Sequence, residues 1–171
     1  MAEGDRAAAH SADAESALGP AALALQELLR ETLSGHEVEA GASVDIPTIQ
    51  VPPQDVPGVC AILKDEPKLS FKMLLCLSAV DYKEYIQMVY VLLSMDQGHK
   101  LILKTDLPYE NLQIGTVSPV WKAADWYERE AHDLFGVNFE GHPYLQPLLL
   151  YDGFEGFPGR KEHPFHDYQE F

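Results

Sequence analysis

The chain has 171 residues, a length that suits one domain with an appended segment, and a formal net charge of −15 at pH 7. Because both ends of the chain are acidic, the sequence offers no basic face for nucleic acid or for an anionic membrane surface. No run reaches the roughly 20 apolar residues of a membrane span, and the acidic start is unlike a secretory signal. The isolated Cys60 and Cys76 cannot by themselves hold an iron–sulfur cluster or a zinc ion.

The first third of the chain predicts a lead-in, two helices and two strands. Residues 1–18 are small, polar and low in complexity, which predicts a disordered acidic lead-in. Pro20 suits the first turn of a helix whose leucines recur at helical spacing. Residues 37–51 predict two short strands, with Pro47 as a break or an edge position. A second helix is expected over 54–65.

Residues 72–106 predict three strands joined by short turns, and short turns imply antiparallel neighbours. The first strand, Lys72 to Tyr82, is nearly all apolar and is therefore expected at the centre of the sheet. The order of elements predicts an α+β fold, a two-layer α/β sandwich with helices on one face of a mainly antiparallel sheet. We assign this domain to residues 19–118, and a helix plus an extended partner-binding arm to residues 119–171.

The C-terminal stretch opens with a short, charged helix. Asp125 is a suitable N-cap, Glu128 completes a capping-box pattern, and Gly136 supplies the stop. Arg129 and Asp133 are four residues apart, so they are expected to pair along the helix surface.

The same stretch contains a candidate metal site. Glu128 and His132 share one helical face, and His142, Asp152 and His163 could complete a set of imidazole and carboxylate ligands. No standard ligand spacing is present, so a free-standing metal-dependent enzyme is the remote hypothesis.

Two further functions are compatible with the stretch. Glu128, Glu130 and Asp133 could serve as acid and base in a hydrolase, but no nucleophile motif accompanies them. The alternative is recognition of another protein. An arm that is rich in aromatic residues and broken by prolines exposes apolar surface of the kind that marks a partner site.

The stretch also carries a resemblance to a known family. Its residues resemble the signature of the C subunit of the proton-pumping NADH–quinone oxidoreductase, respiratory complex I. The matching positions are Glu128-Arg129-Glu130, Asp133-Leu134-Phe135-Gly136-Val137, Phe139, Gly141-His142-Pro143, Leu148-Leu149, Asp152, Glu155-Gly156, Pro158 and Arg160-Lys161. Upstream, Ser78-Ala79-Val80-Asp81-Tyr82 and Trp126-Tyr127 also fit, so the resemblance covers roughly residues 47 to 165.

The resemblance implies a structural subunit of the peripheral arm of that complex, on the cytoplasmic side of the inner (plasma) membrane. It implies no catalytic, cofactor-binding or metal-binding residue in this chain, with FMN and iron–sulfur clusters held by partner subunits. The implied partner is the quinone-site subunit, which is related to hydrogenase large subunits. An equivalent subunit of an energy-converting hydrogenase, or of a ferredoxin- or deazaflavin-linked dehydrogenase, is the alternative. The expected partner interface consists of Glu128, Arg129, Glu130, Asp133, Phe135, Gly136, Phe139, His142, Pro143, Asp152, Arg160 and Lys161.

Overall fold

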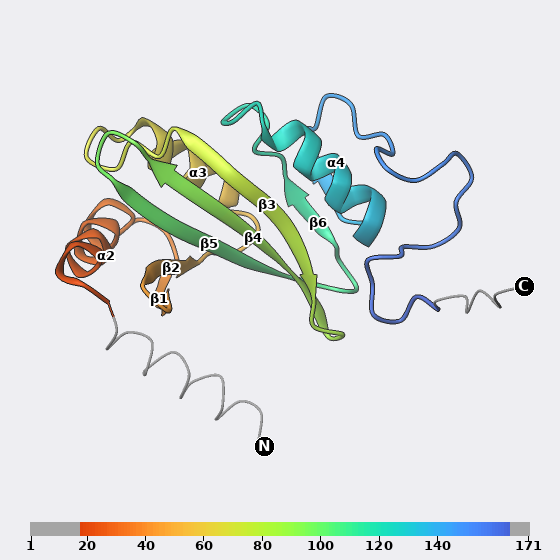
Figure 1. The fold of residues 1–171 in the computed structure, drawn as a ribbon, viewed down its shortest axis with the longest axis horizontal. Helices are drawn as coiled ribbons and strands as arrows, with labels where there is room; N and C mark the ends of the chain where they lie inside the picture. The colour runs from red at the N-terminus through yellow and green to blue at the C-terminus, as the bar shows by residue number, and fades with distance from the viewer. Residues whose placement is uncertain (1–17, 165–171) are drawn as a thin grey trace, which may run out of the picture.

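The computed structural model describes residues 18–164, so residues 1–17 of the predicted lead-in and residues 165–171 of the predicted arm lie outside the described residues. The described elements follow one another along the ribbon of Figure 1. In order they are α2 (Pro20–Thr32), β1 (Glu39–Ser43), β2 (Ile46–Gln50), α3 (Val56–Asp65), β3 (Met73–Asp81), β4 (Tyr85–Ser94), β5 (His99–Pro108), β6 (Gln113–Gly115), α4 (Ala124–Phe135) and β7 (Asn138–Glu140).

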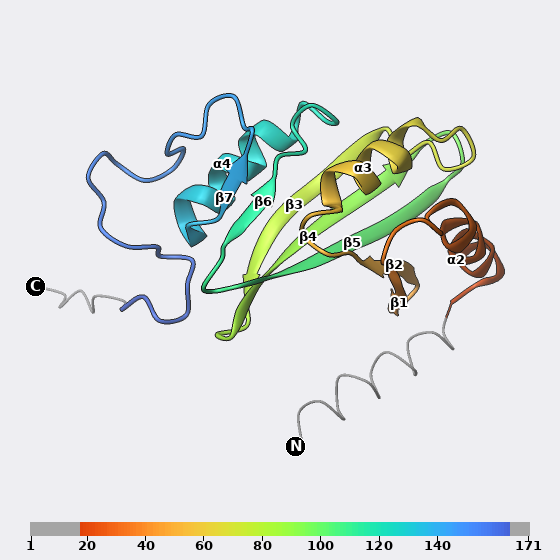
Figure 2. The ribbon, with the colours of Figure 1, turned by 180° about the vertical axis from the view of Figure 1, so that it is seen from behind.

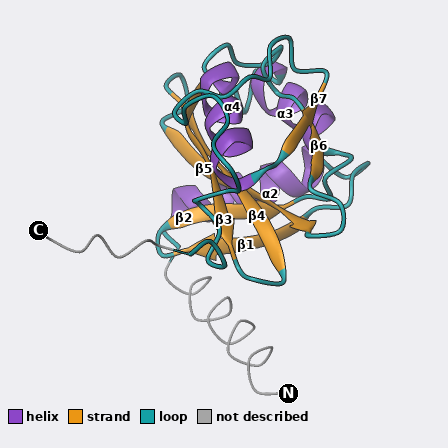
Figure 3. Cartoon of the chain, turned by 90° about the vertical axis from the view of Figure 1, so that its right-hand side faces the viewer, coloured by secondary structure: helices purple, strands orange, loops and turns teal. Residues whose placement is uncertain are grey.

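The main sheet has five strands in the order β1-β2-β5-β4-β3. Its neighbours are antiparallel except for β2 and β5, which run parallel. The predicted α+β fold with a mainly antiparallel sheet is therefore confirmed. A second ladder pairs β6 with β7 in parallel and lies next to α3 and α4 (Figure 3).

The expectation that the apolar strand over 72–82 lies at the centre of the sheet is wrong, because β3 is an edge strand. Its burial alternates, and the apolar side chains on its outer face stay accessible, with Met73 43% and Val80 39% exposed. The free edge of β3 faces α4, where the Tyr127 hydroxyl donates a hydrogen bond to the Leu75 carbonyl at 3.1 Å. The helix therefore covers part of an edge that would otherwise offer unpaired backbone groups.

Pro47 neither breaks its strand nor lies at an edge, because it falls inside β2, between β1 and β5. It is opposite Ala42 of β1, and the pairing of β2 with β5 begins one residue later, at Thr48. The missing N–H of the proline is thus not needed by the β5 ladder. The chain turns instead at Val44 and Asp45, between β1 and β2.

The core lies between the sheet and its helices. Figure 2 shows α3 lying across the strands, whereas in Figure 1 no helix of residues 18–164 lies over the opposite face of β3, β4 and β5. Apolar side chains of α2, α3 and the inner sheet face form one buried cluster, which includes Leu25, Leu29, Val59, Leu63, Tyr90, Leu92, Leu101 and Leu103. Trp121 ties the segment before α4 to this core, since its indole N–H donates to the Phe71 carbonyl at 3.0 Å. Residues from both sides of the predicted boundary at 118 and 119 thus join one core.

Candidate functional site

The first turn of α4 differs from the predicted capping box. The helix begins at Ala124, with Ala123 in the cap position and no side-chain capping bond, so the predicted N-cap Asp125 lies inside the helix. Glu128 is fully buried, where the Val117 N–H donates to its Oε1 at 2.7 Å and the Thr116 hydroxyl donates to its Oε2. Burial raises the pKa of Glu128 to about 7, although both of these hydrogen bonds oppose the rise. The carboxyl group thus fastens α4 to the loop after β6 and does not compensate the helix dipole at the surface.

His142 connects the start of the arm to the same turn of α4. Its imidazole is fully buried, and Nε2 lies 3.1 Å from Asp125 Oδ1, 3.2 Å from the Asp125 carbonyl and 3.7 Å from Glu128 Oε2. Nδ1 accepts a hydrogen bond from the Tyr144 N–H at 3.1 Å, so the proton of the neutral ring belongs on Nε2, facing these oxygens. The site brings together a histidine and two carboxylates from segments 14 and 17 residues apart.

Asp133 and Arg129 hold the next part of the arm. A single oxygen of Asp133, Oδ2, accepts the N–H groups of residues 148, 149 and 150 at 3.1, 2.7 and 2.8 Å. Burial raises the pKa of Asp133, but these three N–H groups lower it by more, so the net pKa lies below the ordinary value. Arg129 donates to the carbonyls of Gln146 and Pro147 at 3.0 and 3.1 Å. The expected surface pair of Arg129 with Asp133 is therefore wrong, because each side chain binds the arm.

The far end of the arm returns to the last turn of α4. Arg160 Nε donates to the Phe135 carbonyl at 2.8 Å, and its guanidinium carbon lies 4.3 Å from the centre of the Phe157 ring. This hydrogen bond satisfies a carbonyl that the helix end leaves free. Gly136 has φ +75°, and a Cβ there would lie 2.6 Å from both Arg160 Nη2 and the Phe157 ring, so glycine is required on both counts.

Asp81, at the end of β3, is an anchor that the expected interface set does not contain. It is 4% exposed, and its carboxylate accepts the N–H groups of Lys83 and of Lys161, both at 2.6 Å. Burial raises the pKa of Asp81, but these two N–H groups and the Tyr109 hydroxyl outweigh burial and hold the pKa below the ordinary value. The sequence offered two signals for Asp81, its place in the upstream part of the family resemblance and its position at a strand end before a turn. Neither signal shows a partner 80 residues away.

The expected interface residues are thus divided between the interior and the surface. Buried within the chain are Glu128, Asp133, Phe139 and the imidazole of His142. Partly buried are Arg129, Phe135, Gly136 and Arg160, and exposed are Glu130, Pro143, Asp152 and Lys161. While its backbone is held by its own domain, the arm points large side chains outward, namely Tyr144, Leu149, Tyr151 and Phe157. The interface itself stays a prediction.

The structure does not assemble the candidate metal site. His132 Nδ1 lies 2.9 Å from the Val137 carbonyl, the His163 ring stacks on Phe154, and Asp152 is exposed. Across residues 18–164, no group of three or more His, Cys, Asp and Glu side chains is placed to hold a metal ion. Of the five expected ligands, Glu128 and His142 approach each other, and both are engaged with the protein.

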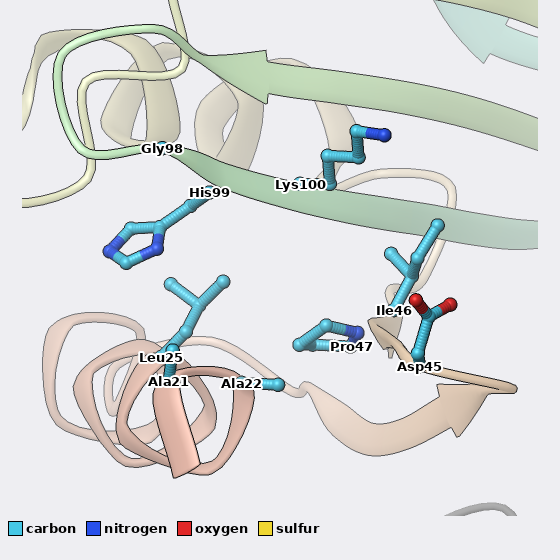
Figure 4. Close-up of a pocket in the computed structure, with 9 residues that line it drawn as sticks. All are labelled: Ala21, Ala22, Leu25, Asp45, Ile46, Pro47, Gly98, His99 and Lys100. Carbon is cyan, nitrogen blue, oxygen red and sulfur yellow. The ribbon is translucent and has the colours of Figure 1, made fainter. Parts of the chain in front are cut away.

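One hollow of about 210 Å³ lies away from these residues, between α2 and the beginnings of β2 and β5. In Figure 4 the His99 ring lies above Leu25 at one end, and Asp45 and Lys100 lie at the other. No expected site residue lines this hollow. The hollow is therefore separate from the charged residues that fasten the arm.

The fold and this site define an α+β domain that binds its own C-terminal arm along one helix and presents the outer side of that arm. No helix within residues 18–164 combines the length and the apolar character of a membrane span. The sequence model of the respiratory-chain NADH dehydrogenase 30 kDa subunit matches residues 49–169. The chain belongs to this family, as the resemblance of its signature residues predicted.

Individual relatives agree with this assignment. The NADH-quinone oxidoreductase C 2 subunit of Rhizobium meliloti is 39% identical over 142 residues, which are 81% of this chain and 78% of the relative. The NADH-quinone oxidoreductase C subunit of Coxiella burnetii is 36% identical over 157 residues, 72% of this chain and 69% of the relative.

Two solved structures share the fold. A chain of the membrane-bound sulfane sulfur reductase, an archaeal respiratory membrane complex, is similar with a TM-score of 0.70 and 28% identity, covering 81% of this chain and 85% of that one. A trypsin-resistant fragment of Nqo5 is similar with a TM-score of 0.56 and 26% identity, covering 71% of this chain and 98% of the fragment.

Proposed function

We propose that the chain is a non-catalytic structural subunit of an NADH–quinone oxidoreductase, in the position of the C subunit. The complex would pass electrons from NADH through FMN and iron–sulfur clusters of other subunits to quinone, coupled to proton translocation. The observation that carries the proposal is the role of the charged residues in the family's signature. Asp133, Arg129 and Arg160 all bind the backbone of the chain's own arm or of α4, and so act as scaffold.

We infer that the arm docks on the quinone-site subunit, on the cytoplasmic side of the membrane, with this chain as a peripheral component. The proposal is supported by the exposed arm side chains, with Tyr144 63%, Leu149 60% and Tyr151 73% exposed. Their backbone is already fixed, so little further ordering is needed when a partner covers them.

A subunit of a related respiratory complex is the second candidate, because the sulfane sulfur reductase chain shares the fold at 28% identity. The relatives named as C subunits of NADH-quinone oxidoreductase are 36% and 39% identical, which favours the first candidate. Electron transfer from NADH to quinone by the purified native complex would separate the two.

Co-purification tests the structural role. The tagged chain, isolated from its detergent-solubilised native membranes, should bring down a quinone-site subunit, and failure to do so would reject the proposal. Arg160→Ala should reduce the amount recovered per chain, because it releases the far end of the arm. Arg30→Ala, which removes an exposed arginine of α2, is the matched control and should have no effect.

Turnover tests the non-catalytic role. Glu128→Gln removes the buried ionisable carboxyl nearest to His142 but keeps its size. NADH–quinone turnover per assembled complex should then stay within about twofold of the native value, since loss of a general acid or base typically costs about 10²–10⁴ in rate. A loss of that size in fully assembled complex would place chemistry on this chain.

A further inference from the structure

An exposed cluster of aromatic and arginine side chains occupies the outer surface of α4 and the beginning of the arm. Trp126 is 64% exposed and Tyr144 63% exposed, and the Arg129 guanidinium lies between them. Its carbon is 5.9 Å from the centre of the Trp126 ring and 5.2 Å from that of the Tyr144 ring. We call these three residues, together with the exposed Leu149 farther along the arm, the Trp126 patch.

The Trp126 patch is held in place from beneath. Arg129 is fixed by its hydrogen bonds to the Gln146 and Pro147 carbonyls, and Leu149 is fixed through its N–H on Asp133. Tryptophan, tyrosine and arginine are the residue types that dominate the binding energy of protein interfaces. Because the Arg129 side chain and the Leu149 backbone are already held, the patch also loses less entropy when it binds.

Exposed carboxylates lie near the patch along α4 and along the arm, and we call them its border. Glu130 lies about one helical turn after Trp126 and is exposed. Asp152 and Glu155 follow Leu149 in the arm and are also exposed. Within residues 18–164 none of these three carboxylates has an ion pair. Arg129 and Arg160 keep their own positive charges, but they donate to backbone carbonyls, and the ion pair of Arg160 is with Glu162, so neither pairs with these three carboxylates.

We propose that the Trp126 patch is the energetic centre of docking on a protein partner whose surface is an apolar cleft bordered by lysine or arginine side chains. The proposal rests on the proposed function and specifies the chemistry of the partner surface. Basic side chains complement the carboxylate border and would steer the encounter. A second copy of this chain would present like charges to the patch and is therefore a poor partner.

Alanine substitutions test the apolar part of the proposal in the full chain, expressed in its native membranes. The complexes are washed with stepwise increasing salt, and the amount of partner subunits that stays bound is measured. Trp126→Ala and Tyr144→Ala should each lower this amount about tenfold or more, as expected for a binding hot spot. Met95→Ala is the matched control, because Met95 is 71% exposed in the turn between β4 and β5, and its retention should equal the native value. Thermal unfolding of the purified chains should change little, since the Trp126 side chain is mostly exposed.

A charge reversal tests the border. Glu130→Lys should lose the partner subunits at lower salt than the native chain does, because it places a lysine against a basic surface. Glu31→Lys makes the same change at an exposed position of α2 and should behave as the native chain does. Equal salt profiles for the two variants would overturn the basic border.

Photo-crosslinking identifies the surface that covers the patch. With p-benzoylphenylalanine at position 144, the crosslinked peptide should come from another subunit and should combine apolar residues with lysine or arginine. A crosslink to a second copy of this chain, to lipid, or to no other molecule would overturn the inference. If the native chain recovers no partner subunit, the proposed function fails. If it does recover one while Trp126→Ala and Tyr144→Ala retain it equally well, only this inference fails.

Discussion

Replacing Asp133 by asparagine should release the middle of the arm without unfolding the domain. The carboxylate Oδ2 accepts three backbone N–H groups, at 2.7–3.1 Å, from residues 148–150. An amide has nearly the size and shape of a carboxylate, so Asp133→Asn removes the negative charge of the acceptor and leaves its shape almost unchanged. The variant therefore isolates the contribution of the negative charge.

The magnitude follows from the three bonds. A hydrogen bond to a charged group contributes about 1.5–3 kcal/mol, against about 1 kcal/mol for a neutral pair. Losing the charge at three bonds should thus cost the closed arm at least about 2 kcal/mol, allowing for incomplete additivity. That free energy corresponds to an about 30-fold larger open population.

Native-state hydrogen exchange at the amides of residues 148–150 measures this population directly. Exchange should accelerate about 30-fold in Asp133→Asn, whereas Glu130→Gln, an exposed neighbour on α4, should leave it unchanged. The folded-state pKa of Asp133 is lowered, so its contribution is present above the ordinary pKa of about 3.9 and is lost as the pH falls through the folded value. Unchanged exchange in Asp133→Asn would show that the three contacts do not hold the arm.

Two further substitutions probe the ends of α4. Glu128→Gln should remove a pH dependence of stability. Burial raises the Glu128 pKa from 4.5 to about 7, so the native chain loses about 3 kcal/mol of unfolding free energy as the pH rises through that window. The difference between the unfolding free energies measured with urea at pH 5 and at pH 7.5 should therefore be smaller for the variant. Gly136→Ala should lower the unfolding free energy by about 1–3 kcal/mol, because a residue with a Cβ is strained at φ +75° and the Cβ meets Arg160 and Phe157. Gly153→Ala is the control, since Gly153 has a similar φ but open space around it. An equal loss of unfolding free energy in both variants would show that the crowding is unimportant.

Patterns in the sequence predicted the main elements of the domain but not the short strands β6 and β7. Apolar runs separated by short turns predicted the strands that became β3, β4 and β5, and helical spacing predicted α2 and α3. The order of the strands in the sheet could not be predicted from these patterns. β3 is apolar on both faces and still lies at the edge, because the parallel pairing of β2 with β5 places β5 and β4 inside.

The individual roles of the charged residues were harder to predict. Asp125 and Glu128 match a capping box, but the cap position is two residues earlier, at Ala123, and Glu128 binds the Thr116–Val117 segment instead. Arg129 and Asp133 have the spacing of a surface pair, but backbone groups of the arm compete for both side chains. Local patterns describe neighbours in the helix, and here the stronger partners lie 11 to 18 residues away.

The sequence by itself determined the α+β class, the position of α4 and the family, because these depend on periodicity and on a long signature of residue types. Only the tertiary structure decided which members of that signature are interior anchors and which reach the surface. Hydrogen bonds such as Asp81 to Lys161 join groups 80 residues apart, and no local pattern contains such a distance. The stretch from Asp125 to Pro164 is therefore an arm fastened by its own domain, with Trp126 and Tyr144 facing outward.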